Sequence, residues 1–406
     1  MGGLAHRLER AERFLVTLIE KPGADRVSNW RVRLLLAALR GLSQLYEGAV
    51  SLRLFLYRHG IFRHHTLGCQ VVSVGNMTVG GTGKTPVVEV FARELQKEGR
   101  RVAVLSRGYK KVEPPWYQKL LDRLSGRENR RPPRVVSDGK RLMLDSAMSG
   151  DEPYMLASNL PNVAVLVDRD RVKSGRYAIK KLGCDTLILD DGFQYLSMKH
   201  RLEIVLVDRT NPFGNGHVLP RGILREPIRN LKRADFIFIT KSNGSDSGEL
   251  RRQLGALNDR AEIIECRHAA RHLKNVFSEE RRELSFLEGR KVIAVSGIAV
   301  PEGFETELRK RGCVILESRR FADHHRYTQQ EVIDIINRGK ERGAEAILTT
   351  EKDAVRFPKL ERRDVPIYFL RVDIELLSGR EDFEHCISRI CFSEGERRRT
   401  AAGPPS

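Results

Sequence analysis

The chain has 406 residues, of which 40% are hydrophobic and 31% are charged. This balance predicts folded domains with ordinary cores and excludes a fibrous or largely disordered protein. Lysine and arginine number 72 against 53 acidic residues, so the net charge of +19 favours an anionic partner: nucleic acid, phospholipid or a phosphorylated substrate. Six scattered cysteines, of which only Cys386 and Cys391 are closely spaced, form no zinc motif and indicate a reducing cytoplasm.

The N-terminal part of the chain contains a predicted amphipathic helix. The first 30 residues are polar and charged, unlike a secretory signal, so we expect the chain to stay uncleaved. Apolar residues recur at helical spacing from 32 to 57, and four polar residues share one stripe: Arg40, Gln44, Glu47 and Ser51. Charges near its middle make a membrane span costly, which favours a helix lying in the membrane interface. A core helix packed on the following domain is the alternative, and the pattern does not decide between them.

A series of strands and helices begins at residue 70. We predict a strand at 70–74, a glycine-rich loop at 75–83 and a helix at 86–99. Short apolar runs then alternate with helical or loop segments, which predicts a mostly parallel sheet with helices on its faces. Further strands of this first set are expected at 101–105, 163–167, 186–189, 204–207 and 236–240. A second set, which predicts a smaller α/β domain, is expected at 291–296, 313–317, 346–348 and 367–370.

The loop between the first strand and helix carries the strongest motif, Thr78-Val79-Gly80-Gly81-Thr82-Gly83-Lys84-Thr85. Its glycines allow backbone amides to turn toward phosphate oxygens, its lysine reaches terminal phosphates, and the hydroxyl of its last threonine suits magnesium. Thr78 stands where the usual P-loop motif has glycine. An ordinary turn requires neither the lysine nor the hydroxyl, so these eight residues predict a nucleotide-binding site.

Acidic residues at two later positions are candidates for holding a metal and for acting as a base. Asp190 and Asp191 follow the strand at 186–189, where a Walker B acid holds magnesium directly or through water. Capping of a turn is the alternative for Asp191. Asp151 and Glu152 open a predicted helix, where an aspartate most often serves as an N-cap. Asp151 is also a candidate general base, and Glu152 is included among the candidate magnesium ligands.

Two further segments contain residues whose role the pattern leaves open. His324 and His325 have no partner spaced to suggest a metal site, so a solvated histidine pair is the simple interpretation. Arg221 and Arg225 lie in a glycine-punctuated loop after the strand that ends at Asp208. Arginine suits bidentate contacts with phosphate, whereas charges that are merely solvated are the alternative.

The fold class expected is α/β, with a P-loop NTPase-type, mostly parallel sheet, a second, smaller α/β domain and an N-terminal membrane-associated helix. We predict an N-terminal segment with the helix (1–62), a P-loop domain (63–261), a two-stranded linker (262–284), the smaller α/β domain (285–392) and a disordered tail (393–406).

Together these motifs resemble the tetraacyldisaccharide 4'-kinase family, the lipid A 4'-kinases of Gram-negative bacteria. The similarity runs from about residue 31 to 369, and the order of the motifs is more specific than any one of them. In that family Thr78 is normal at the first P-loop position. The motifs are residues 74–86, Ser106-Arg-Gly-Tyr109, Gly150-Asp-Glu-Pro153, Asp190-Asp-Gly-Phe-Gln194, Leu224-Arg-Glu-Pro227, Phe321-Ala-Asp-His-His325 and Thr350-Glu-Lys-Asp353.

The resemblance implies that ATP phosphorylates the 4'-hydroxyl of a tetraacyldisaccharide 1-phosphate, which leads to lipid A. It implies that Asp151 is the general base and His324 its partner, and we expect the two to meet across a cleft between domains when nucleotide binds. Lys84 and Thr85 would bind the nucleotide and Mg²⁺, and Arg225 would contact the transferring phosphate.

By the same resemblance, Asp190 and Asp191 belong to the magnesium site. An N-terminal membrane-anchoring helix is also implied, so we expect an acylated disaccharide phosphate and an anionic membrane surface as partners. The expected location is the cytoplasmic face of the bacterial inner membrane.

Two other classes of protein stay open as alternatives. A P-loop ATPase or GTPase that acts as a switch would change partners rather than make a product, but no N-K-x-D guanine motif is evident. A nucleic-acid-associated ATPase fits the positive charge, but no aromatic-rich platform for single strands is evident, so we expect no nucleic acid. We also expect no obligatory protein partner.

Overall fold

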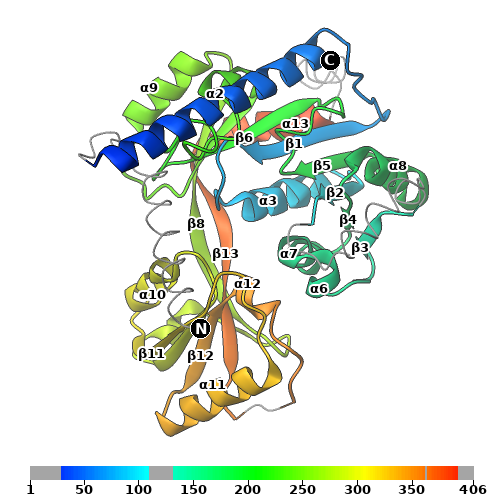
Figure 1. The fold of residues 1–406 in the computed structure, drawn as a ribbon. Helices are drawn as coiled ribbons and strands as arrows, with labels where there is room; N and C mark the ends of the chain where they lie inside the picture. Colours follow the sequence, from blue (N-terminus) through cyan, green and yellow to red (C-terminus); the bar gives the residue numbers. More distant parts are fainter. Residues whose placement is uncertain (1–28, 109–130, 362–363, 392–406) are drawn as a thin grey trace, which may run out of the picture. The chain divides into compact units, whose positions relative to one another are not determined.

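The computed structural model describes residues 29–108, 131–361 and 364–391 (Figure 1). These residues form two compact units. Unit 1 contains the described residues within 1–105, 183–267 and 375–406, and unit 2 contains those within 106–182 and 268–374. The units differ from the contiguous domains expected from the sequence, because strands pair with neighbours in a sheet that lie far away in the chain.

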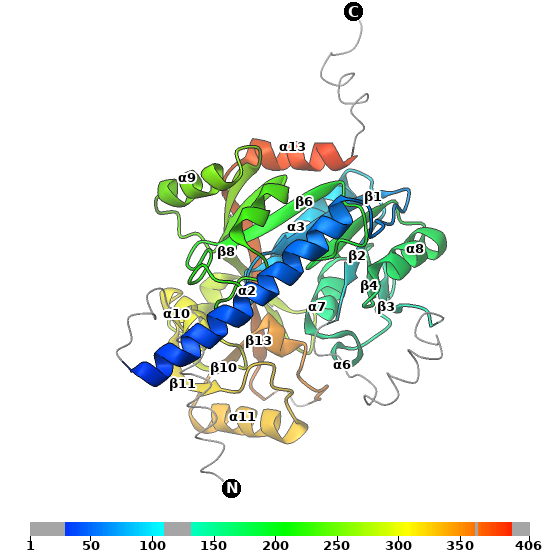
Figure 2. The same ribbon diagram turned by 45° about the horizontal axis from the view of Figure 1, so that its top comes forward.

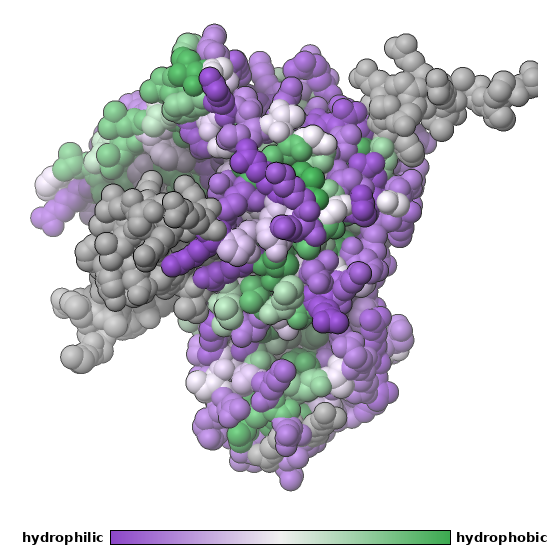
Figure 3. Space-filling view, turned by 90° about the vertical axis from the view of Figure 1, so that its right-hand side faces the viewer, coloured by the Kyte–Doolittle hydropathy of each residue, from purple (hydrophilic) through white to green (hydrophobic). Residues whose placement is uncertain are grey.

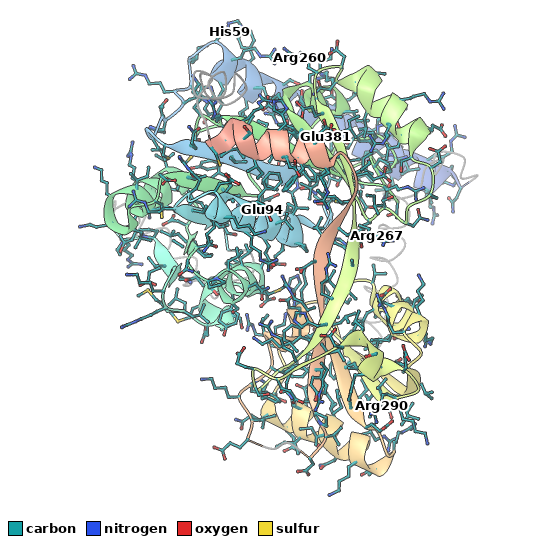
Figure 4. All side chains as sticks on the ribbon, turned by 180° about the vertical axis from the view of Figure 1, so that it is seen from behind. His59, Glu94, Arg260, Arg267, Arg290 and Glu381 are labelled. Atoms are coloured by element: carbon teal, nitrogen blue, oxygen red, sulfur yellow. The ribbon has the colours of Figure 1, made fainter. Side chains whose placement is uncertain are left out.

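Two long strands each contribute residues to both units. They are β8 (Glu262–Asn275) and β13 (Ile367–Ser378), and the unit boundaries fall inside them. Arg267, labelled in Figure 4, lies on β8 and forms an ion pair with Glu375 of β13 at 3.0 Å. Where a pair of linking strands was predicted, the structure has β8 and the two-residue strand β9 (Arg281–Arg282).

Unit 1 is built on a parallel sheet with the strand order β8-β7-β6-β1-β5-β2. Its strands β2, β5 and β7 are buried at every residue, which explains why they appear in the sequence as continuous apolar runs. Besides β8 and β13, the elements of this unit are α2 (Trp30–Arg58), β1 (Gln70–Asn76), α3 (Lys84–Lys97), β2 (Val102–Ser106), β5 (Thr186–Asp190), β6 (Leu202–Asp208), η2 (Ile228–Arg233), β7 (Phe236–Thr240), α9 (Gly248–Leu257) and α13 (Arg380–Cys391).

An aromatic cluster connects helices of unit 1 to its sheet. Phe91 of α3, Phe238 of β7 and Phe383 of α13 meet edge to face, with ring centroids 5.1 to 6.3 Å apart. Each phenylalanine that is fully buried contributes about 1.5–3 kcal/mol of stability. The cluster therefore stabilises the helix that follows the glycine loop with residues from the far end of the chain.

The predicted amphipathic helix is present as α2, a single uninterrupted helix (Figure 2). Its polar side faces the rest of unit 1: the Ser43 hydroxyl donates to the Val218 carbonyl at 2.5 Å, and Glu47 forms an ion pair with Arg229 at 2.6 Å. Large apolar side chains of α2 stay exposed, and hydrophobic atoms gather along the upper left edge of Figure 3. They are Trp30, Leu34, Leu35, Leu42, Leu45, Leu52 and Phe55.

This arrangement does not fit the core-helix alternative, in which the apolar side of α2 would be packed against a domain. Leu34 and Leu45 are 67% and 73% exposed. Within the described parts of the chain, every helix is too short or too polar to cross a membrane.

Unit 2 contains parallel strands in the order β11-β10-β12-β13. Strand β8 pairs with β9, and β3 with β4, in antiparallel orientation. The elements of this unit are β3 (Arg134–Asp138), α6 (Ser146–Ser149), α7 (Asp151–Asn159), β4 (Ala164–Val167), α8 (Arg171–Leu182), η3 (Leu284–Leu287), β10 (Lys291–Ser296), α10 (Pro301–Lys310), β11 (Val314–Arg320), α11 (Gln329–Glu341), β12 (Ala346–Thr350) and α12 (Glu351–Ala354).

The α/β class and the mostly parallel pairing are confirmed. Each predicted strand is present, although β13 continues to Ser378 where the prediction ended at residue 370. Strand β3 was missed, because only Val135 and Val136 interrupt its polar sequence.

Candidate active site

The glycine loop lies between β1 and α3 in unit 1. Gly80 and Gly83 have φ angles of 109° and 79°, in the left-handed region that residues with a Cβ atom rarely adopt. Helix α3 begins at Lys84, two residues before the predicted start at Pro86. Pro86 still fits inside the helix, because the first helical turn does not require an N–H donor. Lys84 and Thr85 therefore lie at a helix N-terminus, where free N–H groups and the helix dipole attract anions.

Two polar partners hold the side chain of Lys84. Its Nζ lies 3.2 Å from Asn76 Oδ1 and 3.4 Å from Asp191 Oδ1. Asn76 Nδ2 also donates to the carbonyl of Thr78 at 2.8 Å, so one amide side chain positions both the lysine and the start of the loop. The Lys84 side chain is 17% exposed, which leaves the ammonium within reach of a ligand.

Asp191 lies between two cations. It follows β5 with a φ angle of 57°, and both its carboxylate oxygens are 2.8 Å from Arg225 Nη1. Burial by itself would raise the pKa of Asp191, but Lys84 and Arg225 outweigh burial and the pKa is lowered. The carboxylate is therefore ionised at neutral pH. Asp190 precedes it at the end of β5, beside Val74 of β1, and is 9% exposed.

The loop that carries Arg225 is attached to the glycine loop through its backbone. Thr78 forms an isolated antiparallel bridge with Leu224, and the N–H of Arg225 donates to the carbonyl of Met77 at 2.7 Å. Two segments about 150 positions apart in the chain, 77–79 and 223–225, are thereby joined. This attachment brings the Arg225 guanidinium to Asp191.

Gln194 and Glu226 support this arrangement, and the sequence did not single them out. Gln194 Nε2 donates to the carbonyl of Asn76 at 3.1 Å and to Glu226 Oε1 at 3.0 Å. Glu226 is 3% exposed and also forms an ion pair with Arg233 at 3.0 Å. Both residues belong to motifs that we used only for the family resemblance: Gln194 follows Asp191 by three positions, and Glu226 is next to Arg225.

The oxygen atoms around the glycine loop suit magnesium. The Thr85 hydroxyl and the carboxylates of Asp190 and Asp191 are the hard ligands that Mg²⁺ prefers. The Thr82 hydroxyl is buried and, within the described residues, has no hydrogen-bond partner. Among the residues that the structure describes, no three His, Cys, Asp or Glu side chains lie together as a metal-binding group. Magnesium commonly completes its coordination with water and with the phosphate oxygens of a substrate.

Asp151 begins α7 in unit 2 but is not its N-cap. The N-cap is Gly150, whose φ angle is 95°. Asp151 is 5% exposed, and its Oδ2 accepts from Arg356 Nε at 2.8 Å and lies 3.1 Å from Nδ1 of His324. Its two polar partners therefore hold this buried carboxylate in one position.

His324 and Asp151 lie 173 positions apart in the chain, yet both belong to unit 2. Their hydrogen bond is already formed in the structure, so the expected closure of two domains is not needed to bring them together. His324 has a φ angle of 64°, and its N–H donates to the carbonyl of Gly297 at 3.1 Å. His325 instead contacts Glu331 at 3.1 Å and stacks on Phe321.

Glu152 and Arg221, the other candidates from the sequence, have different surroundings. Glu152 forms an ion pair with Lys352 at 3.2 Å in unit 2. Arg221 is 2% exposed, and its N–H donates to the Ser43 hydroxyl at 3.1 Å, so its backbone helps to hold α2. Arg356, three residues after the motif that ends at Asp353, was missed, because nothing in the local sequence distinguishes a buried arginine from a solvated one.

The fold and the site of unit 1 define a P-loop nucleotide-binding protein. A glycine-rich loop joins a central parallel strand to a helix that starts with Lys84-Thr85, and the neighbouring strand ends at Asp190 and is followed by Asp191.

Comparison with known proteins defines the family more closely. Residues 35–391 match the family model LpxK, described as Tetraacyldisaccharide-1-P 4'-kinase. A protein from Syntrophus aciditrophicus named Tetraacyldisaccharide 4'-kinase is 37% identical over 358 residues, covering 86% of this chain and 91% of the relative. The protein of the same name from Geobacter metallireducens is 39% identical over 351 residues, covering 86% and 96%. The chain belongs to the tetraacyldisaccharide-1-P 4'-kinase family.

A solved structure supports this assignment at the level of the fold. The crystal structure of LpxK from Aquifex aeolicus in complex with ATP is 29% identical in sequence, with a TM-score of 0.69, and the match covers 88% of this chain and 100% of that one.

Proposed function

We propose that this chain is an ATP-dependent tetraacyldisaccharide 4'-kinase of lipid A biosynthesis. The family match over residues 35–391, with an intact P-loop inside it, is the observation that carries the proposal. In this reaction the 4'-oxygen of the sugar forms a bond to the γ-phosphorus of ATP. The bond from that phosphorus to the β,γ-bridging oxygen breaks, ADP leaves, and the hydroxyl proton passes to a base.

The residues of unit 1 bind and orient the donor. The backbone N–H groups of 78–85 contact phosphate oxygens, and Lys84 offsets the charge of the terminal phosphates. Arg225 contacts the transferring group with its planar guanidinium. Both cations are now held by Asp191, so an incoming phosphate would take over partners that are already positioned.

Thr85, Asp190 and Asp191 would hold Mg²⁺, which supplies positive charge to the phosphate oxygens when it is bound. Glu152 is retained as a further predicted ligand, although its carboxylate pairs with Lys352.

Asp151 accepts the proton of the 4'-hydroxyl, and His324 orients the carboxylate and receives the proton from it. A sugar hydroxyl is a weak nucleophile, so a base at the attacking oxygen lowers the barrier. The buried hydrogen bond between the two side chains supports this assignment, which otherwise rests on the family motifs.

Helix α2 binds the protein to an anionic membrane surface, where the acylated substrate is found. Its exposed leucines provide an apolar face, and exposed arginines beside them attract anionic headgroups. These arginines are Arg31, Arg33, Arg53 and Arg58. The corresponding location is the cytoplasmic face of the bacterial inner membrane.

A product assay tests the proposal. Purified protein is incubated with Mg-ATP labelled at the γ-phosphate and with tetraacyldisaccharide 1-phosphate, and transfer of label to the lipid is measured. We expect labelled bisphosphate, and ATP turnover that rises with the lipid but not with DNA or RNA. ATP hydrolysis without lipid product, or turnover stimulated by nucleic acid, would show that the proposed function is incorrect.

A further inference from the structure

The contacts around Asp151 point to a residue that the mechanism above does not use. Arg356 follows α12 in unit 2, and its side chain is fully buried. Its Nε donates to Asp151 Oδ2 at 2.8 Å, and its Nη2 lies 3.2 Å from Nδ1 of His324. We propose that Arg356 is a positioning residue whose single guanidinium orients both members of the Asp151–His324 pair. This inference rests on the proposed role of that pair in phosphoryl transfer.

The guanidinium is itself held from its other side. Its Nη1 donates to the carbonyl of Gly297 at 3.0 Å and to Asp353 Oδ1 at 3.2 Å. Asp353 is completely buried and also accepts from the Tyr327 hydroxyl at 3.1 Å and from the N–H of Gly297 at 3.0 Å. A planar guanidinium bonded through all three of its nitrogens cannot rotate without breaking several hydrogen bonds together. The fold of unit 2 therefore sets its orientation, and through it the positions of Asp151 and His324.

The charges of this cluster also depend on Arg356. Two buried carboxylates, Asp151 and Asp353, flank the guanidinium, and a buried charge is stable only when it is paired and hydrogen-bonded. Arg326 also approaches Asp151, at 3.4 Å, but its side chain is 42% exposed and is therefore a weaker constraint. Without Arg356, Asp151 and Asp353 would repel each other inside the protein, and Asp151 would leave its present position.

The same guanidinium also holds the ring of His324. Its Nδ1 lies 3.1 Å from Asp151 Oδ2 and 3.2 Å from Arg356 Nη2. A protonated Nδ1 donates to the carboxylate, whereas an unprotonated Nδ1 accepts from the guanidinium, because arginine only donates hydrogen bonds. In both tautomers Arg356 fixes the position of the ring, since it contacts Nδ1 and holds the carboxylate that Nδ1 faces.

Arg356→Ala tests the positioning role by kinetics. Misplacing catalytic groups by about 1 Å typically costs about 100-fold in rate, so we expect kcat to fall by that factor while KM for ATP changes little. Millimolar guanidinium should restore part of kcat by occupying the vacated space. Arg371→Ala is the matched control, because Arg371 is also buried in unit 2 and is held by Glu351 at 2.8 Å and Asp373 at 2.9 Å. Arg371→Ala should lower the free energy of unfolding, and added guanidinium should not raise its kcat.

The ring nitrogens of His324 give a readout that a purely structural role would not change. In protein labelled with ¹⁵N-histidine and assigned with His324→Gln, we expect the Nδ1 signal of the wild type to shift in Arg356→Ala, because Arg356 contacts that nitrogen. If Arg356→Ala does not fold, the same measurements are made on Arg356→Lys, which keeps the charge but not the planar guanidinium.

Full kcat with an unchanged Nδ1 signal in a folded Arg356 variant would overturn the inference. Asp151→Asn separates this result from the proposed function. If Asp151→Asn keeps full activity, the base assignment itself is incorrect. If Asp151→Asn is inactive while Arg356→Ala is fully active, only the role of Arg356 is refuted.

Discussion

Asp151→Asn, alone and combined with His324→Ala, tests whether Asp151 is the base of this kinase. The substitution keeps the shape of the side chain but removes its charge and basicity. General base catalysis contributes about 10²–10⁴-fold, so kcat should fall by a factor in that range. His324→Ala removes an orienting partner and should lower kcat less. Residues that act as one unit have non-additive effects, so the double variant should resemble Asp151→Asn alone.

The contacts of Asp151 also set the stability cost of this substitution. Asp151 is 5% exposed and accepts from Arg356 Nε at 2.8 Å, and a hydrogen bond to a charged group contributes about 1.5–3 kcal/mol. Arg356 would keep its bond to Asp353 at 3.2 Å, so the loss should stay below the roughly 3–5 kcal/mol that follows when a buried charge loses its partner. We expect the free energy of unfolding to fall by about 1–3 kcal/mol.

Glu351→Gln is the matched control for this loss of stability. Glu351 forms an ion pair with buried Arg371 at 2.8 Å, and Arg371 would keep Asp373 at 2.9 Å, so the same kind of bond is lost elsewhere in unit 2. Denaturant titration gives the free energy of unfolding, and initial rates of 4'-phosphate formation give kcat for each folded molecule. Additive kinetic losses, or an Asp151→Asn protein with full activity per folded molecule, would refute the base role.

Three further predictions concern other parts of the molecule. Lys84→Ala should nearly abolish lipid phosphorylation in a product assay while circular dichroism stays unchanged, because the ammonium faces ligand phosphates; normal turnover would remove the P-loop from the mechanism. Leu45→Glu with Leu52→Glu should weaken sedimentation with anionic vesicles, whereas Gln44→Glu on the polar side should weaken it much less; equal effects would argue against α2 as the membrane contact. Burial by itself would raise the pKa of Asp208, but Lys241 and Thr210 outweigh burial, so the pKa is lowered. The stability that this carboxylate contributes is therefore present above its ordinary pKa and is lost as the pH falls through the lowered pKa. The difference in unfolding free energy between wild type and Asp208→Asn should therefore be constant at neutral pH and shrink in acid; a difference that grows in acid would contradict this sign.

The local sequence was sufficient to predict the α/β class, most strands and the P-loop. Buried parallel strands appear as continuous apolar runs, and a phosphate loop requires glycine, lysine and a hydroxyl at adjacent positions, so both signals lie within short segments. The family resemblance followed from the order of such segments. It also supplied the roles of Asp151 and His324, which residue types and spacing alone left as a helix cap and a solvated pair.

Only the tertiary structure decided which distant residues meet. Arg356 lies 205 positions from Asp151 and 32 from His324, and its importance comes from complete burial between carboxylates. The division into units was also beyond the sequence, because β8 and β13 each contribute to both. The amphipathic pattern of α2 was visible, but not which side is attached to unit 1. That was decided by partners such as Val218 and Arg229, which hydrogen-bond its polar side and leave its leucines exposed.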